Sequence, residues 1–199
     1  MAPKYLDLMF TDAVCRAQTH YYGQAGKIAG APDLDPLGPA EAEFIAMRDS
    51  FYIGSISESG WPYIQHRGGP EGFLRLLDET TLVFADYKGN RQLLSTGNVS
   101  VNDRIALFLM DYKNCERLKI LGHARIEDAL AHPELTEQVA DVKMRSSVER
   151  LVFIDVVSFD WNCPKYITPR YSADEVEKLT GPLRSRIAEL EAELHTRKS

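Results

Sequence analysis

The chain has 199 residues, of which 44% are hydrophobic and 26% are charged, and its formal net charge is −6. This length is enough to bury one sizeable core, and the composition excludes wholesale disorder and a fibrous architecture. The excess of negative charge argues against a broad nucleic-acid surface, so any bound anion should be small and held locally.

Targeting and redox signals are weak. The longest apolar runs are too short to cross a bilayer, and the first ten residues lack the apolar stretch of a secretory signal, so we expect a cytoplasmic protein without membrane contact. Cys15, Cys115 and Cys163 are widely separated, form no CxxC pair and have no histidine at zinc-ligand spacing. We therefore expect reduced thiols and no metal site.

The first part of the chain predicts two helices joined by an irregular connector. Residues 12–22 form the first helix, with Thr11 as its N-cap and Gly23 at its end. A Gly- and Pro-rich connector follows, and Pro39 occupies the first turn of the second helix. The apolar residues of the second helix that should face a core are Phe44, Ile45 and Met47.

A run of short strands begins at Phe51. The first two strands form a hairpin, and residues 68–80 read as a loop. Helical patterns cover residues 90–96 and 133–146, the latter with an apolar side of Leu135, Val139, Val142 and Met144. The strands are expected at residues 51–57, 61–68, 81–87, 104–111, 117–128 and 151–162. Helices that are inserted among short strands, rather than alternating strictly, favour a small antiparallel barrel over a parallel α/β sheet.

After Pro169 the chain turns polar and helical, and Gly181 with Pro182 marks a break at which a last helix starts. This helix has one apolar seam, at steps of four, three and four residues: Leu183, Ile187, Leu190 and Leu194. Two interpretations stay open: the helix packs on its own barrel, or it forms a short coil with another subunit. The chain thus divides into an N-terminal helix and connector (1–38), a barrel (39–171) and a helical tail (172–199).

Two segments carry the candidate chemistry. The segment DYKGNRQLLSTGN (86–98) follows a strand and opens a helix, where free backbone N–H groups and the cations Lys88 and Arg91 suit a phosphate. The alternative is a solvated turn. On the strand WPYIQHRG (61–68), alternation places Gln65 and Arg67 on one face and His66 on the other. An arginine at a barrel rim can also be purely structural.

The order of segments resembles the FMN-binding branch of the pyridoxamine 5'-phosphate oxidase family over about residues 44–171. The segments that carry the resemblance are the hairpin, QHRGGPEGF, LVFADYKGNRQ, STGN, DRIALFLMD, RLKILG and WNCPKYITPRY. The resemblance implies a mainly β (α+β) split β-barrel that binds FMN at a homodimer interface. The residues it places at the cofactor are Gln65, His66, Arg67, Gly68, Ala85, Asp86, Lys88, Asn90, Arg91, Gln92, Arg117 and Trp161.

The resemblance also implies roles for these residues. Arg67 is the strongest choice for a cation near the flavin, and Asn90 with Arg91 stands where the family contacts the phosphate. Arg117 sits where a later strand, often of the partner subunit, reaches the flavin, and Trp161 would lie near the isoalloxazine edge. The alternatives are a core aromatic for Trp161, a surface ion pair for Arg117 and a structural role for His66.

The expected function is an FMN-dependent oxidoreductase acting on a small organic substrate or electron acceptor, in which the flavin performs the redox chemistry and no catalytic side chain is needed. The alternative is a non-catalytic module that stores or senses flavin, or that holds haem or a deazaflavin. Genuine pyridoxamine phosphate oxidases carry an arginine and histidine pair near the C-terminus, whereas Arg170 has no histidine close behind it. Vitamin B6 oxidation is therefore not expected. Hydrolase, metalloprotease and Walker motifs are absent.

Overall fold

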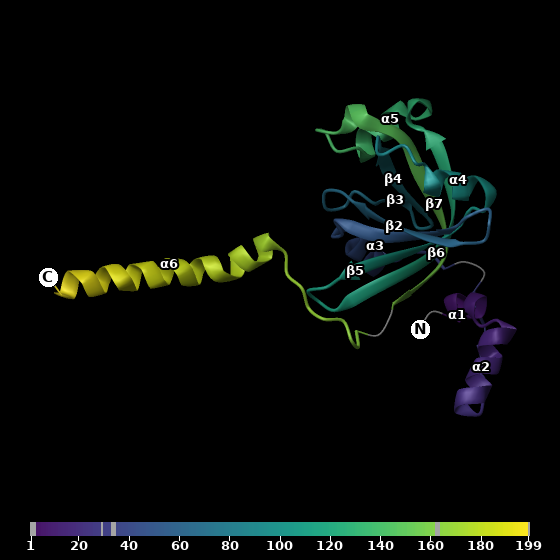
Figure 1. Cartoon of the computed structure of the whole chain (residues 1–199), viewed down its shortest axis with the longest axis horizontal. Coiled ribbons are helices and arrows are strands. Elements are labelled where there is room, and N and C mark those ends of the chain that lie inside the picture. Colours follow the sequence, from purple (N-terminus) through teal and green to yellow (C-terminus); the bar gives the residue numbers. More distant parts are fainter. Residues whose placement is uncertain (1–2, 29, 33–34, 162–163, 199) are drawn as a thin grey trace.

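The computed structural model describes residues 3–28, 30–32, 35–161 and 164–198 (Figure 1). Two helical turns of the 3-10 type, Ala129–Ala131 and Arg145–Ser147, lie beside the regular elements. The helices are α1 (Pro3–Met9), α2 (Asp12–Tyr22), α3 (Pro39–Ala46), α4 (Leu94–Val101), α5 (Pro133–Val139) and α6 (Ala173–Lys198). The strands are β1 (Ser50–Ile56), β2 (Pro62–Gly68), β3 (Arg75–Asp78), β4 (Thr81–Tyr87), β5 (Arg104–Asp111), β6 (Glu116–Asp128) and β7 (Val148–Trp161).

All seven strands belong to one sheet, in the order β2-β1-β5-β6-β7-β4-β3, and every neighbouring pair is antiparallel. The sheet curls so that β1 returns over β4: the ring of Phe51 lies 5.3 Å from that of Phe84 and 5.4 Å from that of Phe73. Alternating apolar residues fill the space inside the curl and make the main core. This confirms the predicted mainly β, α+β split barrel.

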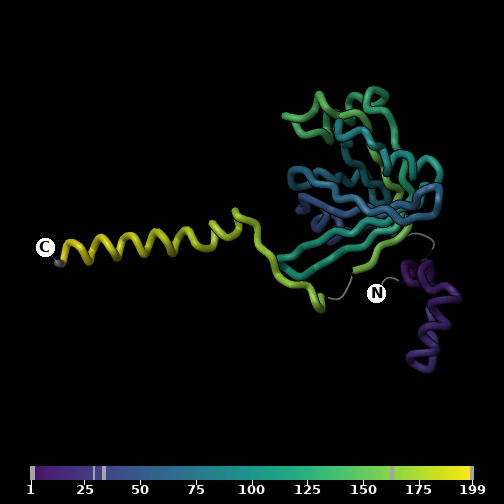
Figure 2. The backbone as a smooth tube through the Cα atoms, in the orientation of Figure 1, coloured from purple at the N-terminus to yellow at the C-terminus, as the bar shows by residue number. Residues whose placement is uncertain are grey.

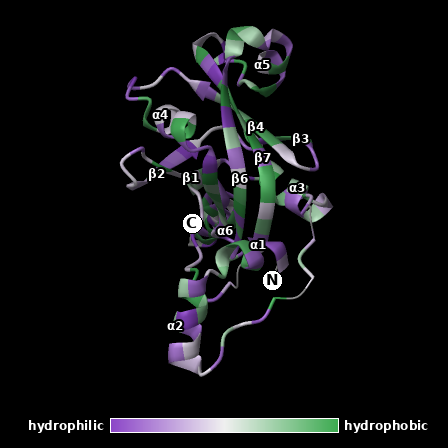
Figure 3. Cartoon of the chain, turned by 90° about the vertical axis from the view of Figure 1, so that its right-hand side faces the viewer, coloured by the Kyte–Doolittle hydropathy of each residue, from purple (hydrophilic) through white to green (hydrophobic). Residues whose placement is uncertain are grey.

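The core draws on almost every strand, as the distribution of hydrophobic residues along β4, β6 and β7 shows (Figure 3). The largest fully buried side chains include Phe51, Phe84, Leu107, Ile120 and Ile154. Burying one such side chain stabilises the fold by about 1.5–3 kcal/mol. Among the described residues, no helix is both long and apolar enough to span a membrane.

Opposite Gly122 the strand β7 has a bulge: the register shifts between Leu121 and Gly122 of β6, and Val157 of β7 is left without a partner in the pairing. A Cβ at Gly122 would stand 2.8 Å from the carbonyl oxygen of Asp155 and 2.9 Å from Cγ2 of Ile154. Only glycine fits against β7 here, and bulges of this kind increase the local twist that a curled sheet needs.

Arg48 fastens the end of α3 to the sheet. Its Nη2 lies 2.8 Å from Oδ2 of Asp111, while Nη1 donates to the carbonyl of Met110 at 3.1 Å. Burial by itself raises the pKa of Asp111, but hydrogen bonds from the backbone and side chain of Asn114, together with Arg48, lower it more. The pKa of Asp111 therefore lies below its ordinary value, and the buried carboxylate stays charged.

The structure corrects several sequence-based boundaries. The first helix agrees, because the Thr11 hydroxyl accepts from the N–H of Val14 and Gly23 ends the helix with a φ of 79°. Helix α1 and strand β3 were not predicted, and β3 lies inside the segment read as a loop. Helix α5 ends at Val139, so two residues of its expected apolar side lie beyond the helix: Val142 is 78% exposed and Met144 is 49% exposed. Met47, which was expected to face the core from the second helix, follows α3 and is 46% exposed.

The tail differs most from expectation. Helix α6 runs unbroken from Ala173 to Lys198 with Pro182 inside it, so the predicted break at Gly181 and Pro182 is wrong. It does not pack on its own barrel either, because it extends away from the body of the molecule (Figures 1 and 2). The expectation on Cys163 lies outside the described residues.

Candidate functional site

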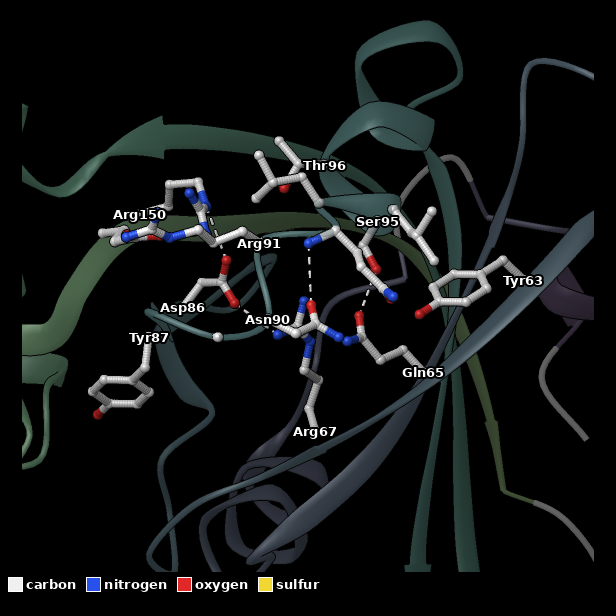
Figure 4. A pocket seen from close by; sticks show the side chains of 15 residues that line it. Tyr63, Gln65, Arg67, Asp86, Tyr87, Asn90, Arg91, Ser95, Thr96 and Arg150 are labelled. Carbon is white, nitrogen blue, oxygen red and sulfur yellow. Dashed lines mark hydrogen bonds and ion pairs between the residues drawn. The ribbon is translucent and has the colours of Figure 1, made fainter.

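A pocket opens between β2, β4, the start of β7 and the beginning of α4 (Figure 4). It holds about 490 Å³ of space, including the part open to solvent. The lining residues are Tyr63, Gln65, Arg67, Asp86, Tyr87, Gly89, Asn90, Arg91, Gln92, Leu93, Leu94, Ser95, Thr96, Glu149 and Arg150.

Asp86 organises two arginines at the pocket wall. Its Oδ1 lies 2.6 Å from Nη1 of Arg67, and its Oδ2 lies 2.9 Å from Nε of Arg150. The pairing of β4 with β7 places Asp86 directly opposite Arg150, and the curl of the sheet brings β2 and Arg67 to the same carboxylate. With only 7% of its side chain exposed, Asp86 is held by both cations, and each guanidinium is fixed in position.

Arg67 has a hydrogen-bond donor that the fold leaves unused. Its Nε is buried and has no hydrogen-bond partner among the described residues. Leaving a buried donor unpaired costs about 1–3 kcal/mol, and native proteins seldom do so without a reason. The side chain lines the pocket, so an anion bound there is a natural acceptor for this N–H.

The loop between β4 and α4 carries backbone strain. Arg91 and Leu93 have φ angles of 61° and 53°, in the left-handed region that residues with a Cβ rarely occupy. The side chain of Asn90 accepts a hydrogen bond from the N–H of Gln92 at 3.1 Å, which tightens the turn. Each left-handed residue costs about 1–3 kcal/mol, and such strain gathers at ligand sites. In the described part of the chain, no ion pair or hydrogen bond engages the Arg91 guanidinium.

The same strain explains why α4 begins later than predicted. Left-handed Arg91 and Leu93 prevent helical geometry before Leu94, and Leu93 provides no side-chain cap. The first residues of α4, Leu94, Ser95 and Thr96, line the pocket, and this helix start has no side-chain cap and carries a positive partial charge. Ser95 lines the pocket in this first turn, and its hydroxyl donates to Oε1 of Gln65 on β2 at 2.7 Å.

The pocket is suited to an anion with several oxygens. Three arginines, Arg67, Arg91 and Arg150, line it against two carboxylates, Asp86 and Glu149, and the uncapped helix adds further positive potential. Guanidinium groups match phosphate geometry through paired N–H donors. In the parts of the chain that the structure describes, His, Cys, Asp and Glu form no cluster able to hold a metal ion.

A second hollow adjoins this pocket on the other side of Arg150. It shares Thr96, Glu149 and Arg150 with the first and is also lined by Ile126, Glu127, Asp128, Leu130 and Val148. Its space is about 970 Å³, including the part open to solvent. At its edge, a hydrogen bond from His132, helped by Arg125, holds the pKa of Glu127 below its ordinary value. The two hollows together leave room for a molecule much larger than a phosphate ion.

The structure brings half of the sequence-predicted site residues into the pocket. These are Gln65, Arg67, Asp86, Asn90, Arg91 and Gln92. The others do not line it: His66, Gly68, Ala85, Lys88, Arg117 and Trp161.

The remaining six lie in identifiable places. His66 is on the opposite face of β2 from Gln65, where its ring contacts Tyr52, and Arg117 lies over the ring of Phe108. Trp161 packs edge-on against Phe44, and its Nε1 donates to Oε1 of Glu41 at 2.5 Å. Ala85 is buried in the smaller core cluster, the N–H of Lys88 donates to the carbonyl of Ser147, and Gly68 ends β2.

Sequence reasoning missed Tyr63, Tyr87, Ser95, Glu149 and Arg150 as pocket residues. Alternation along β2 was the available signal for Tyr63, since it shares a face with Gln65 and Arg67. No signal existed for Arg150, because the strand was expected to begin at residue 151 and its register with β4 cannot be read from one sequence.

The chain is thus a small antiparallel split barrel with an arginine-lined pocket. Residues 37–152, more than half of the chain, match the family model described as pyridoxamine 5'-phosphate oxidase. The chain therefore belongs to the pyridoxamine 5'-phosphate oxidase family. No curated protein sequence matches the chain.

Solved structures resemble the chain at low identity. A variant of HupZ from Group A Streptococcus is 15% identical, with a TM-score of 0.50 over 63% of this chain and 99% of that one. General stress protein 26 from Bacillus anthracis is 12% identical, with a TM-score of 0.47 over 60% and 89%. An FMN-binding protein from Syntrophomonas wolfei is 8% identical, with a TM-score of 0.45 over 61% and 83%. At these identities the likeness concerns the fold alone.

Proposed function

We propose that this protein binds FMN, with the cofactor's phosphate in the pocket at the start of α4. The observation that carries the proposal is the buried Nε of Arg67, a donor without a protein acceptor, in a pocket lined by Arg91 and Arg150. A phosphate monoester carries about −1.5 to −2 charges at pH 7 and presents three acceptor oxygens. It matches both the charge and the donors of this site.

The residues present fit such a group. Arg67, Arg91 and Arg150 would hold the phosphate together with the N–H groups at the start of α4. The side chains of Gln65 and Gln92 supply further polar groups for the ribityl chain. The adjoining hollow, lined partly by Ile126 and Val148, offers space for the remainder of the cofactor.

The activity that we propose is oxidoreduction of a small organic substrate. FMN, when bound, supplies the electron and hydride transfer, and the protein supplies binding, orientation and electrostatics. Asp86 holds Arg67 and Arg150 in fixed positions, so these cations need little reorganisation when an anion arrives. No side chain of the pocket is assigned a catalytic role.

We further propose a homodimer in which a second copy covers the outer face of β1 and β2. This face, opposite the pocket face of β2, exposes Ile64 by 70% and also exposes Tyr52 and Ile56. Nearby, Nε of Arg117 is buried without a partner in the described chain. Contiguous exposed apolar residues mark interaction sites, and two-fold dimers are the commonest oligomers.

The dimer is tested by measuring the monomer–dimer dissociation constant by analytical ultracentrifugation. Ile64→Glu places a charge at the centre of the face and should raise this constant, whereas Val142→Glu, at a position that is 78% exposed, should not. An unchanged constant for Ile64→Glu would remove this face from the interface.

The phosphate site is tested by titrating the protein with FMN and with riboflavin, which lacks the phosphate, and following flavin fluorescence. Arg91→Ala should weaken FMN binding by about 1.5–3 kcal/mol, the worth of a hydrogen bond to a charged group, and leave riboflavin binding unchanged. The control is Arg75→Ala, an exposed position on β3 away from the pocket. Equal losses for both flavins would place Arg91 outside the phosphate site.

Repeated reduction and reoxidation of the bound flavin distinguishes an enzyme from a flavin-storage protein. An oxidoreductase should show reduction of its bound flavin by a nicotinamide nucleotide or another donor, and reoxidation by an acceptor, over repeated cycles. A flavin that binds tightly but is turned over by none of them would favour a non-catalytic module.

A further inference from the structure

Helix α6 carries an apolar seam that the structure leaves uncovered. Six side chains form this α6 seam: Val176, Leu179, Leu183, Ile187, Leu190 and Leu194. Each is between 42% and 64% exposed. At 3.6 residues per turn they fall within a stripe about 80° wide, so they make one narrow face along a helix of 26 residues. A helix of this length measures about 39 Å.

The α6 seam includes two residues before the four that the sequence pattern identified, so its spacing is considered over all six. Successive seam residues are separated by three, four and four residues from Val176 to Ile187, and the same 11-residue pattern then begins again with steps of three and four residues to Leu194. An 11-residue repeat keeps a seam on one side of a nearly straight or slightly right-handed helix pair. Pro182 lies outside the seam. The seam is therefore built for contact with another long helix.

Contacts within the chain hold the start of α6 in place, but these contacts do not cover the seam. Lys113, at the turn between β5 and β6, lies with its Nζ 3.4 Å from Oε1 of Glu175. Just before the helix, Arg170 stacks over the ring of Tyr112 at 4.8 Å. These contacts fix where α6 leaves the barrel, and the helix then extends away from it (Figure 2).

We infer that the α6 seam is covered by α6 of a second copy, with the two helices parallel and in register. In this arrangement the charged residues beside the seam of one copy face residues of opposite charge on the other copy. Arg186 lies along one edge of the seam and Glu191 along the other, five residues further on. In a parallel pair, Arg186 of each copy faces Glu191 of the other, which is the spacing of interhelical ion pairs in parallel coils.

The parallel arrangement also uses the whole seam. Each of its six residues meets the same residue of the second copy, so six apolar layers form. An antiparallel pair centred between Leu183 and Ile187 buries the same six residues, but it places Arg186 of one copy beside Arg186 of the other. The charges beside the seam therefore favour the parallel pair.

The charges of α6 argue against a membrane surface as the occupant. Helices that lie on anionic membranes carry a polar face rich in Lys and Arg. Here the helix has six acidic and five basic residues, so its polar side is close to neutral. A second copy, which brings the same balanced charges, fits better. This interface does not depend on the proposed flavin site or on the sheet-face dimer.

The test uses disulfide formation in the full-length chain. Leu179→Cys places a thiol in the α6 seam, where parallel copies bring the two sulfurs within bonding reach, since linked Cα atoms lie about 4.4–6.8 Å apart. In the antiparallel pair centred between Leu183 and Ile187 the same thiols would stand about 18 Å apart along the helix axis. The matched control is Lys178→Cys, one residue away on the polar side. Both are oxidised mildly at low protein concentration and compared with the parent chain, which accounts for the native thiols.

The expected result is conversion of most of the Leu179→Cys chain to a linked dimer, with the control and the parent remaining mainly unlinked. Adding Ile187→Asp to the Leu179→Cys chain should abolish the linkage, because it buries a charge in the seam. No linkage at Leu179, or equal linkage at both positions, would overturn the inference. It would equally be overturned by a chain that is monomeric in solution and binds vesicles of anionic lipid through α6.

Discussion

Replacing Arg67 by lysine separates ligand binding from fold stability. Lysine keeps a positive charge within reach of Asp86, so the ion pair that is 2.6 Å long in the native chain persists in some form. It removes the buried Nε, which has no partner in the described chain and which we assign to the phosphate. FMN binding should therefore weaken by about 1–3 kcal/mol, which is about 5- to 150-fold in Kd.

The free protein should respond differently from the complex. An unsatisfied buried donor opposes folding, so Arg67→Lys should leave the melting temperature of the cofactor-free protein unchanged or slightly higher. Affinity is measured by flavin fluorescence and stability by thermal denaturation, with Arg75→Lys on β3 as the matched change outside the pocket. An Arg67→Lys protein that binds FMN with native affinity would refute the role given to Nε.

Four further substitutions test the scaffold. Gly122→Ala should lower the free energy of unfolding by about 1–3 kcal/mol, because its Cβ would overlap with β7. Gly97→Ala should raise this free energy by about 0.5–1 kcal/mol, because a Cβ there meets nothing within 4 Å. Both changes are measured by denaturant unfolding. Folding lowers the pKa of Asp111, so this carboxylate stabilises the fold above its ordinary pKa, and the stabilisation is lost as the pH falls through the pKa of the folded state. The difference in melting temperature between the native chain and Asp111→Asn should therefore become smaller below about pH 4. A difference that stays constant with pH would contradict this prediction. Pro182→Ala should stabilise α6 by about 3 kcal/mol and slow its amide exchange, since proline removes one helical hydrogen bond.

The strands could be predicted because their signal is local. Residues 81–87 and 104–111 combine β-branched and aromatic residues with clear turn signals, and both strands were found at their observed bounds. Strand β3 was missed because RLLD is short, lies at the sheet edge and follows a segment rich in Gly. The break expected at Pro182 is wrong because α6 continues for several turns on either side of it, and the hydrogen bonds of those turns outweigh the one that proline removes.

The pocket shows a different limit. The loop at Arg91 could be predicted because cations near a strand-to-helix junction are visible in a single sequence. The carboxylate that joins Arg67 to Arg150 depends on the pairing of β4 with β7, two strands separated by about 60 residues of chain. Such a long-range register follows from the curl of the whole sheet, which local patterns do not encode.

In the proposed site a flavin is held by its phosphate between Arg67, Arg91 and Arg150. The most direct measurement is the absorption spectrum of the protein after incubation with excess FMN and removal of the free cofactor, compared with the same treatment with riboflavin. We predict that the bands of oxidised flavin remain with FMN and are largely lost with riboflavin. A protein that stays colourless after FMN, or that retains both flavins equally, would contradict the account.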